Sequence, residues 1–207
     1  MFIAMVGLMT GLNNFTEELT MTSSPDIHIY NDVTEERPTL AEQVNPGGIN
    51  FVHHQKPKRE TPKLRNARQL TELIRKDPRV MGVAPTLSSQ VFYNYGPVQL
   101  NGTVAGVDIL EEDKLFDLRS KMKSGRLEDL QANADGIIMG TGLARKLNVK
   151  TGDRVVITTP EGYTMTLKIV GTFQMGIGLV DNVRSYANIS TVQVILQQDQ
   201  SYITDIN

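Results

Sequence analysis

The chain has 207 residues, a formal net charge of -2, and no cysteine or tryptophan. This length suits one large domain or two small ones, with a core that needs no disulfide or metal. The lack of cysteine excludes a disulfide scaffold, a thiol nucleophile and zinc sites with sulfur ligands. The balance of 21 basic against 23 acidic residues argues against a protein that binds a nucleic-acid backbone.

The first twelve residues, Met1 to Leu12, are mostly apolar. A membrane-spanning helix needs roughly 20 apolar residues, so this segment cannot cross a bilayer alone. It lacks the positive start and the small-residue cleavage site of a secretory signal. Two explanations remain, a buried first helix of a soluble domain or the outer end of a transmembrane helix.

The first half of the chain predicts a strand, a helix and a hairpin. Residues 26–30 alternate in the manner of a half-buried strand, and residues 31–63 show no periodicity and predict a long loop. A hairpin with one apolar face is expected between Leu87 and Val104, turning at Gly96-Pro97. This order is half of a split β-α-β sandwich. The helix between the loop and the hairpin has one apolar stripe, formed by Leu64, Ala67, Leu70, Leu73 and Ile74.

The second half begins with a charged helical pattern over residues 109–131, with Leu115, Leu118 and Met122 on one stripe. Short strands and tight turns follow. Strands are predicted at residues 137–139, 155–157, 165–169, 183–189 and 202–207, with short helices at residues 142–147 and 190–196.

Residues with catalytic or metal-binding chemistry are few. The adjacent pair His53 and His54 points its side chains apart, and His28 stands alone, so no metal site is predicted. No serine lies in a nucleophile elbow. The segment Gly140-Thr141-Gly142 lacks the third glycine of a dinucleotide fingerprint and the lysine of a P-loop. We therefore predict no catalytic, cofactor-binding or metal-binding residue and no cofactor.

Two charged groupings precede the β-rich half. The carboxylates Glu111, Glu112 and Asp113 suit a helix N-terminus, where the helix dipole favours negative charge. Basic residues gather between His53 and Arg68, and they suit contact with anionic headgroups or an acidic partner, or else an ordinary solvated loop and helix edge. This candidate basic patch consists of Lys56, Lys58, Arg59, Lys63, Arg65 and Arg68.

A glycine-rich apolar loop follows the predicted strand at residues 165–169. Its members, called here the Met175–Leu179 loop, are Met175, Gly176, Ile177, Gly178 and Leu179. Exposed apolar loops mark contacts with partners or membranes more often than chemistry. The loop is therefore a candidate partner-contact site, and the alternative is a buried crossing between strands.

Three stretches together resemble the periplasmic domain of an ABC-transporter permease of the MacB and lipoprotein-releasing (LolC/LolE) type. Gly7 to Leu12, running on to Pro25-Asp26-Ile27-His28-Ile29, is similar to the family's exit from its first transmembrane helix. Gly102-Thr103-Val104-Ala105-Gly106-Val107-Asp108 resembles the family's V-x-G-V-D strand end. The third stretch comprises Gly125-Arg126-Leu127, Ile137 to Gly140, Leu143 to Val155 and Ile169 to Phe173.

The resemblance implies an α+β fold without enzymatic activity. Residues 1–25 would be the outer end of the first transmembrane helix and its exit segment. Residues 26–108 with 199–207 would form a split β-α-β, Porter-like lobe, which includes the loop at 31–63, and residues 109–198 an inserted β-rich, Sabre-like lobe. The domain would lie on the periplasmic side of the inner membrane.

The resemblance also implies partners. They are the membrane-spanning part of the same permease, a cytoplasmic ATPase subunit, a second permease copy or homologue, and a lipoprotein or periplasmic adaptor, with no nucleic acid. Some lipoprotein-releasing members extend the hairpin that corresponds to Ile157 to Thr164 into a hook for a carrier chaperone, whereas only about four residues turn this corner here. The alternative function is a stand-alone extracytoplasmic binding domain, although no signal or lipidation site is visible.

Overall fold

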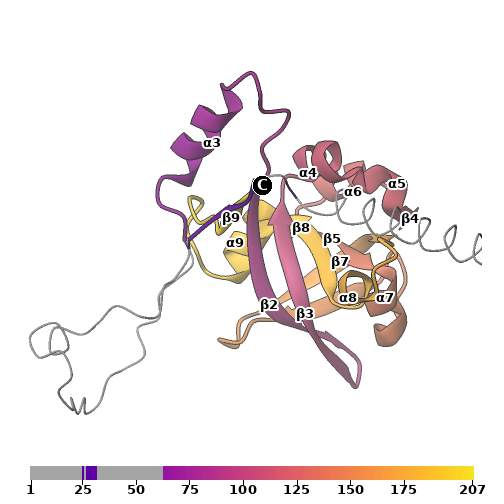
Figure 1. Ribbon diagram of the computed structural model, residues 1–207. Coiled ribbons are helices and arrows are strands. Elements are labelled where there is room, and N and C mark those ends of the chain that lie inside the picture. Colours follow the sequence, from indigo (N-terminus) through magenta and orange to yellow (C-terminus); the bar gives the residue numbers. More distant parts are fainter. Residues whose placement is uncertain (1–24, 26, 32–62) are drawn as a thin grey trace, which may run out of the picture.

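The computed structural model describes residues 25, 27–31 and 63–207 (Figure 1). The predicted transmembrane end and exit segment at residues 1–25, except Pro25, and most of the predicted loop at 31–63 lie outside the described residues. Within the described part, no helix has the length and apolar character needed to cross a membrane.

Short strands and short helices alternate through most of the chain. The strands are β1 (Ile29–Tyr30), β2 (Pro85–Tyr95), β3 (Val98–Val107), β4 (Met122–Ser124), β5 (Gly136–Gly140), β6 (Arg154–Thr158), β7 (Thr164–Phe173), β8 (Arg184–Asn188) and β9 (Asp205–Ile206). The helices are α3 (Ala67–Arg75), α4 (Ile109–Phe116), α5 (Leu118–Lys121), α6 (Leu127–Ala132), α7 (Thr141–Leu147), α8 (Gly178–Asp181) and α9 (Ile189–Ile195).

Six of these strands close into a barrel. The pairing runs β2, β3, β8, β5, β7 and β6, and β6 returns to pair with β2. The β3/β8 and β5/β7 pairs are parallel, and the others are antiparallel. Closure leaves these six strands no free edge, which protects the backbone groups of the sheet from pairing with other chains.

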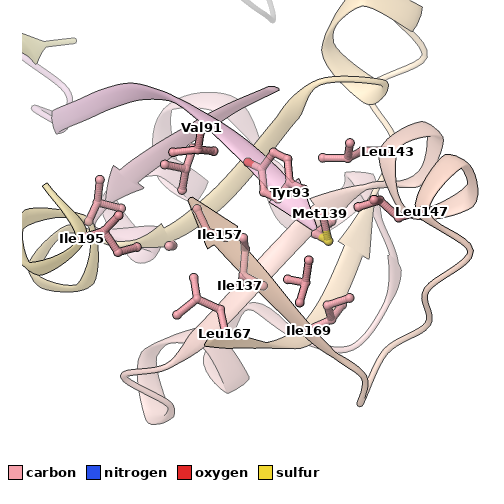
Figure 2. Packing of buried hydrophobic residues seen from close by; sticks show 14 of the residues in the cluster. Val91, Tyr93, Ile137, Met139, Leu143, Leu147, Ile157, Leu167, Ile169 and Ile195 are labelled. Atoms are coloured by element: carbon pink, nitrogen blue, oxygen red, sulfur yellow. The ribbon is translucent and has the colours of Figure 1, made fainter. Parts of the chain in front are cut away.

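The barrel interior is apolar because alternate residues of each strand point inward. Val91 and Tyr93 of β2 meet Ile137 and Met139 of β5 there, as Figure 2 shows. Each buried side chain of this size contributes about 1.5–3 kcal/mol. Other members of this cluster come from β6 and β7 and from the helices α7 and α9: Leu143, Leu147, Val155, Ile157, Leu167, Ile169, Val192 and Ile195.

A second apolar layer covers part of the outside of the barrel. Helices α4, α5 and α6 lie together beside the sheet, whereas α3 lies apart from them (Figure 1). Ile138 of β5 points outward into this layer, so β5 is buried on both faces and reads as a continuous apolar run. Phe173 and Tyr186 belong to the same layer as Ile138, and the centroids of their aromatic rings are 5.1 Å apart.

The predicted helical segment over residues 109–131 contains three short helices, α4, α5 and α6, in place of one continuous helix. Asp117 adopts a left-handed backbone conformation with φ of 47° and ends α4. Met122, expected on the helix stripe, lies in β4 and pairs with Phe173 of β7. Gly125, with φ of 72°, then turns the chain into α6 at a point where any side chain would overlap the carbonyl oxygen of Val170.

Helix α3 packs on a third, smaller cluster with β1 and β9. Leu64 and Ala67 are buried there against Ile203 and Ile206, as the predicted stripe requires. Leu73 is 70% exposed, so the prediction is wrong for this member of the stripe.

The α+β class is confirmed. Strand pairing, however, crosses the predicted boundary between the two lobes at residues 108/109. The hairpin of β2 and β3 belongs to the predicted Porter-like lobe. Its β2 pairs with β9 at one end and with β6 at the other, and its β3 pairs with β8. The hairpin thus completes the barrel of the predicted Sabre-like lobe. The division into Porter-like and Sabre-like lobes stays a prediction.

Candidate functional site

The Met175–Leu179 loop is held in a defined turn after β7. The buried carboxylate of Asp181 accepts hydrogen bonds from the backbone N–H groups of Met175, at 2.7 Å, and Gly176, at 3.0 Å. Leu179 is 84% exposed, whereas Met175 and Ile177 are half-buried. The loop therefore presents one apolar side chain to solvent and turns two toward the molecule. Its role as a partner contact stays a prediction.

Replacing Asp181 with alanine is expected to lower the free energy of unfolding by about 1–3 kcal/mol, because two backbone donors lose a buried, charged acceptor. Urea unfolding followed by circular dichroism measures the change. Asp135→Ala is the matched control, since Asp135 is exposed and its side chain is expected to contribute within about 0.5 kcal/mol. Equal stabilities of the two variants would contradict this role of Asp181.

A cavity of about 450 Å³ lies beside the loop, within the size range of ligand pockets. Met175 and Ile177 line one side of the cavity, and Glu112 and Phe116 of α4 line another. Arg184 of β8 also lines it. The loop that the sequence singled out thus borders the cavity.

Glu112 is the unusual group in this cavity. Its side chain is only 3% exposed, and its Oε2 atom has no hydrogen-bond partner among the described residues. Burial raises the pKa of Glu112 to about 7, and the nearby positive charge of Arg184 opposes this rise only in part. Glu112 therefore changes charge near neutral pH.

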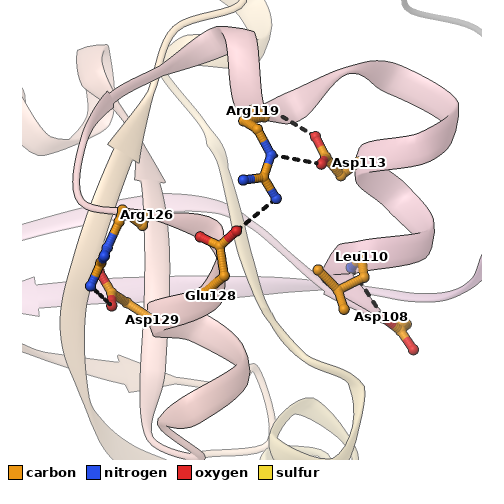
Figure 3. Close-up of polar contacts among 7 residues, drawn as sticks. All are labelled: Asp108, Leu110, Asp113, Arg119, Arg126, Glu128 and Asp129. Carbon is orange, nitrogen blue, oxygen red and sulfur yellow. Dashed lines mark hydrogen bonds and ion pairs between the residues drawn. The ribbon is translucent and has the colours of Figure 1, made fainter.

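A polar network holds α4, and with it Glu112, in place (Figure 3). At the start of the helix, the Asp108 carboxylate accepts a hydrogen bond of 3.1 Å from the backbone N–H of Leu110. After the helix, the Arg119 guanidinium bridges Asp113, at 3.3 Å, and Glu128 of α6, at 2.7 Å. These contacts tie α4 to α6 and fix which face of α4 meets the cavity.

The other side of the cavity carries a second ionisable pair. His28 Nε2 lies 3.1 Å from Asp205 Oδ1, joining residues far apart in the sequence. Thr204 donates a hydrogen bond of 2.6 Å to the other Asp205 oxygen. Both carboxylate oxygens of Asp205 are thus engaged. Over the described ranges, no group of three or more histidine or carboxylate side chains could hold a metal ion.

The candidate basic patch is only partly described. Lys56, Lys58 and Arg59 lie outside the described residues. Lys63 forms an ion pair of 3.0 Å with Asp199, and its ammonium lies over the Tyr202 ring. The remaining two members, Arg65 and Arg68, are exposed near the start of α3. Contact of this patch with an anionic partner stays a prediction.

The segment Gly140-Thr141-Gly142 joins β5 to α7 as expected, and its first glycine serves packing. A side chain at Gly140 would overlap the carbonyl oxygen of Asp181, so the glycine lets α8 approach the strand end. The same contact sets the position of the Met175–Leu179 loop.

Sequence reasoning placed Glu112 at a helix start but did not identify it as a cavity residue. A signal was present, because Ile109, Glu112 and Phe116 are spaced by three and four residues and share one helix face. In α4, Glu112 is buried together with Ile109 on this face. Arg184 carried no comparable signal.

Comparison with known proteins identifies the family. The profile of the family described as MacB-like periplasmic core domain matches residues 1–206. The chain is 30% identical over 135 residues to the lipoprotein-releasing system transmembrane protein LolC of Xylella fastidiosa, and 29% identical over 131 residues to that of Neisseria meningitidis serogroup B. These matches cover 59% and 58% of this chain but only 32% and 31% of the relatives, so the chain spans about a third of their length.

A solved structure supports the fold. The periplasmic region of MacB from Actinobacillus actinomycetemcomitans superposes with a TM-score of 0.51 at 16% identity, covering 86% of this chain and 71% of that one. The predicted resemblance to MacB and LolC permeases is confirmed by the family match over nearly the whole chain. The chain belongs to the MacB-like periplasmic core domain family.

Proposed function

We propose that this chain is the periplasmic domain of an ABC-transporter permease subunit of the inner membrane. In this role it couples ATP-driven movement of the membrane helices to substrate or partner proteins outside that membrane, in lipoprotein release or efflux. The observation that carries the proposal is the family match over residues 1–206. The LolC relatives, named as transmembrane proteins of a lipoprotein-releasing system, support lipoprotein release as one form of this role.

The partners follow from this role. The domain would connect to the membrane-spanning part of the same permease, and a cytoplasmic ATPase subunit would drive it. A second permease copy or homologue would complete the transporter, and a lipoprotein or a periplasmic adaptor would meet the domain from outside. The domain itself would carry out no chemical reaction.

Coupling predicts that the domain moves when the ATPase binds nucleotide. This chain has no cysteine, so a cysteine introduced at the exposed Glu161, between β6 and β7, gives the domain one spin label. The second spin label is placed at the extramembrane end of another helix. The protein used is the whole permease with its native cysteines replaced. Trapping the ATPase with ATP and vanadate is expected to change the distance between the labels, measured by pulsed electron paramagnetic resonance.

The control is the same labelled permease with an ATPase variant that cannot bind ATP, in which the distance should stay constant. Identical distances with and without trapped nucleotide, in a transporter that still hydrolyses ATP, would contradict the coupling. Such a result would favour a binding domain that acts without the ATPase cycle.

A further inference from the structure

Two side chains of opposite charge line the cavity without pairing. Glu112 Oε2 has no hydrogen-bond partner in the described part of the chain, and no ion pair within 4.0 Å joins Arg184 to a carboxylate there. The Arg184 guanidinium instead lies over the Tyr186 ring, 5.5 Å from its centroid. Both groups are still close enough for Arg184 to influence the ionisation of Glu112.

A buried polar atom without a partner is costly, and most such atoms in native proteins are satisfied. The cavity walls around Glu112 offer apolar surface from Phe116, Met175 and Ile177. A ligand suited to these walls would donate a hydrogen bond to the Glu112 carboxylate, accept one from Arg184, and place an apolar group against Phe116, Met175 and Ile177.

The charges in the cavity select among candidate partners. A ligand with a lone ammonium group would satisfy Glu112 but would be repelled by Arg184. A ligand with a lone carboxylate would satisfy Arg184 but would be repelled by Glu112 and by Asp205, which already pairs with His28. An amide is neutral and carries both a donor and an acceptor, so it suits the pair.

We propose that the cavity binds a short extended peptide segment, with a backbone N–H donating to Glu112, a carbonyl accepting from Arg184, and one apolar side chain against Phe116 and the Met175–Leu179 loop. The cavity volume of about 450 Å³ lies within the range of sites for small ligands. The inference rests on the proposed function in that the peptide would belong to the substrate or partner of the permease.

The test is a titration of the ¹⁵N-labelled 207-residue chain with the peptide acetyl-Ala-Leu-Ala-amide, followed by amide NMR signals. Signals of Met175 and Ile177, which line the cavity, are expected to shift in a saturable manner. Isobutylamine and isovalerate serve as the cationic and anionic probes, and acetyl-Gly-Gly-Gly-amide lacks the apolar side chain. All three should bind at least tenfold more weakly.

Two variants test whether the peptide contacts Glu112 and Arg184. Glu112→Leu and Arg184→Met are each expected to weaken binding of acetyl-Ala-Leu-Ala-amide at least tenfold, which is about the effect of one hydrogen bond to a charged group. Lys114→Met, an exposed change on the same helix, should leave the affinity unchanged. Signals of the barrel strands report that each variant remains folded.

Several results would overturn the inference. They are saturation by isobutylamine or isovalerate at lower concentration than by the peptide, equal affinity in all three variants, or no shift up to the solubility limit of the peptide. The outcome is separate from that of the spin-label experiment. Nucleotide-driven movement without peptide binding refutes only this site, and peptide binding without such movement refutes only the coupling.

Discussion

Replacing Tyr93 with alanine is expected to lower the free energy of unfolding by about 3–5 kcal/mol, the range for removing a large aromatic side chain from a core. Tyr93 is 0% exposed and lies at the centre of the barrel, where β2 faces β5 and β8 (Figure 2). Its hydroxyl shares a hydrogen bond of 2.5 Å with Ser185. Small proteins have total stabilities of about 5–15 kcal/mol, so this loss is a large fraction. Denaturant unfolding followed by circular dichroism measures it.

Two further variants separate the ring from the hydroxyl. Tyr93→Phe keeps the ring and removes the hydrogen bond to Ser185, whose hydroxyl can still donate to the Thr103 carbonyl oxygen at 3.5 Å. We therefore expect a smaller loss of about 0.5–1.5 kcal/mol. Burial raises the pKa of Tyr93, so the hydroxyl stays protonated. Tyr95→Ala, two residues along the same strand and 36% exposed, is the matched control for ring removal. The central role of Tyr93 fails if Tyr93→Ala and Tyr95→Ala lower stability equally.

The barrel strands could be predicted as elements but not as a barrel. Alternation in residues 87–104 predicted the β2/β3 hairpin, because neighbouring strands joined by a tight turn pair locally. The pairing of β3 with β8, which brings Val104 beside Ser185, joins segments about 80 residues apart. Periodicity carries no information about such distant partners, so closure of the barrel could not be seen in the sequence.

The breaks in residues 109–131 could not be predicted for a different reason. The apolar spacing there is compatible with one helix, and the interruption depends on Asp117 adopting a left-handed conformation. Aspartate tolerates this conformation but does not require it. Packing of Leu118 in the outer layer and pairing of Met122 with β7 therefore decide where the helix ends.

The candidate site was predicted in part. Glycines and apolar residues marked the Met175–Leu179 loop, because that composition is unusual after a strand. The cavity depends on residues from five distant segments, including Glu112, Arg184 and the His28/Asp205 pair. Their convergence is a tertiary property, and only the spacing of Glu112 between Ile109 and Phe116 hinted at it.

The stability of the domain is expected to fall as the pH rises from about 5 to 8, and Glu112 is the reason. The pKa of Glu112 is raised from its ordinary value of 4.5 to about 7 in the folded chain. Between these values the folded state binds more protons than the unfolded state, so the free energy of unfolding decreases with pH. The full contribution is present below about pH 4.5 and is lost as the pH passes about 7, a change on the order of 3 kcal/mol.

Glu112→Gln removes this titration. The free energy of unfolding of the variant minus that of the parent chain is therefore expected to be about 1–3 kcal/mol larger at pH 8 than at pH 5. Urea unfolding of both proteins at the two pH values measures this change, in which contributions from other groups cancel. Glu128→Gln is the control, because the pKa of Glu128 is lowered by hydrogen bonds to its own backbone N–H and to Arg119. Its contribution is constant above about pH 5, so its curve should run parallel to that of the parent. If the Glu112→Gln curve is equally parallel, then Glu112 is ionised in the folded chain throughout this range and the cavity holds a permanent carboxylate.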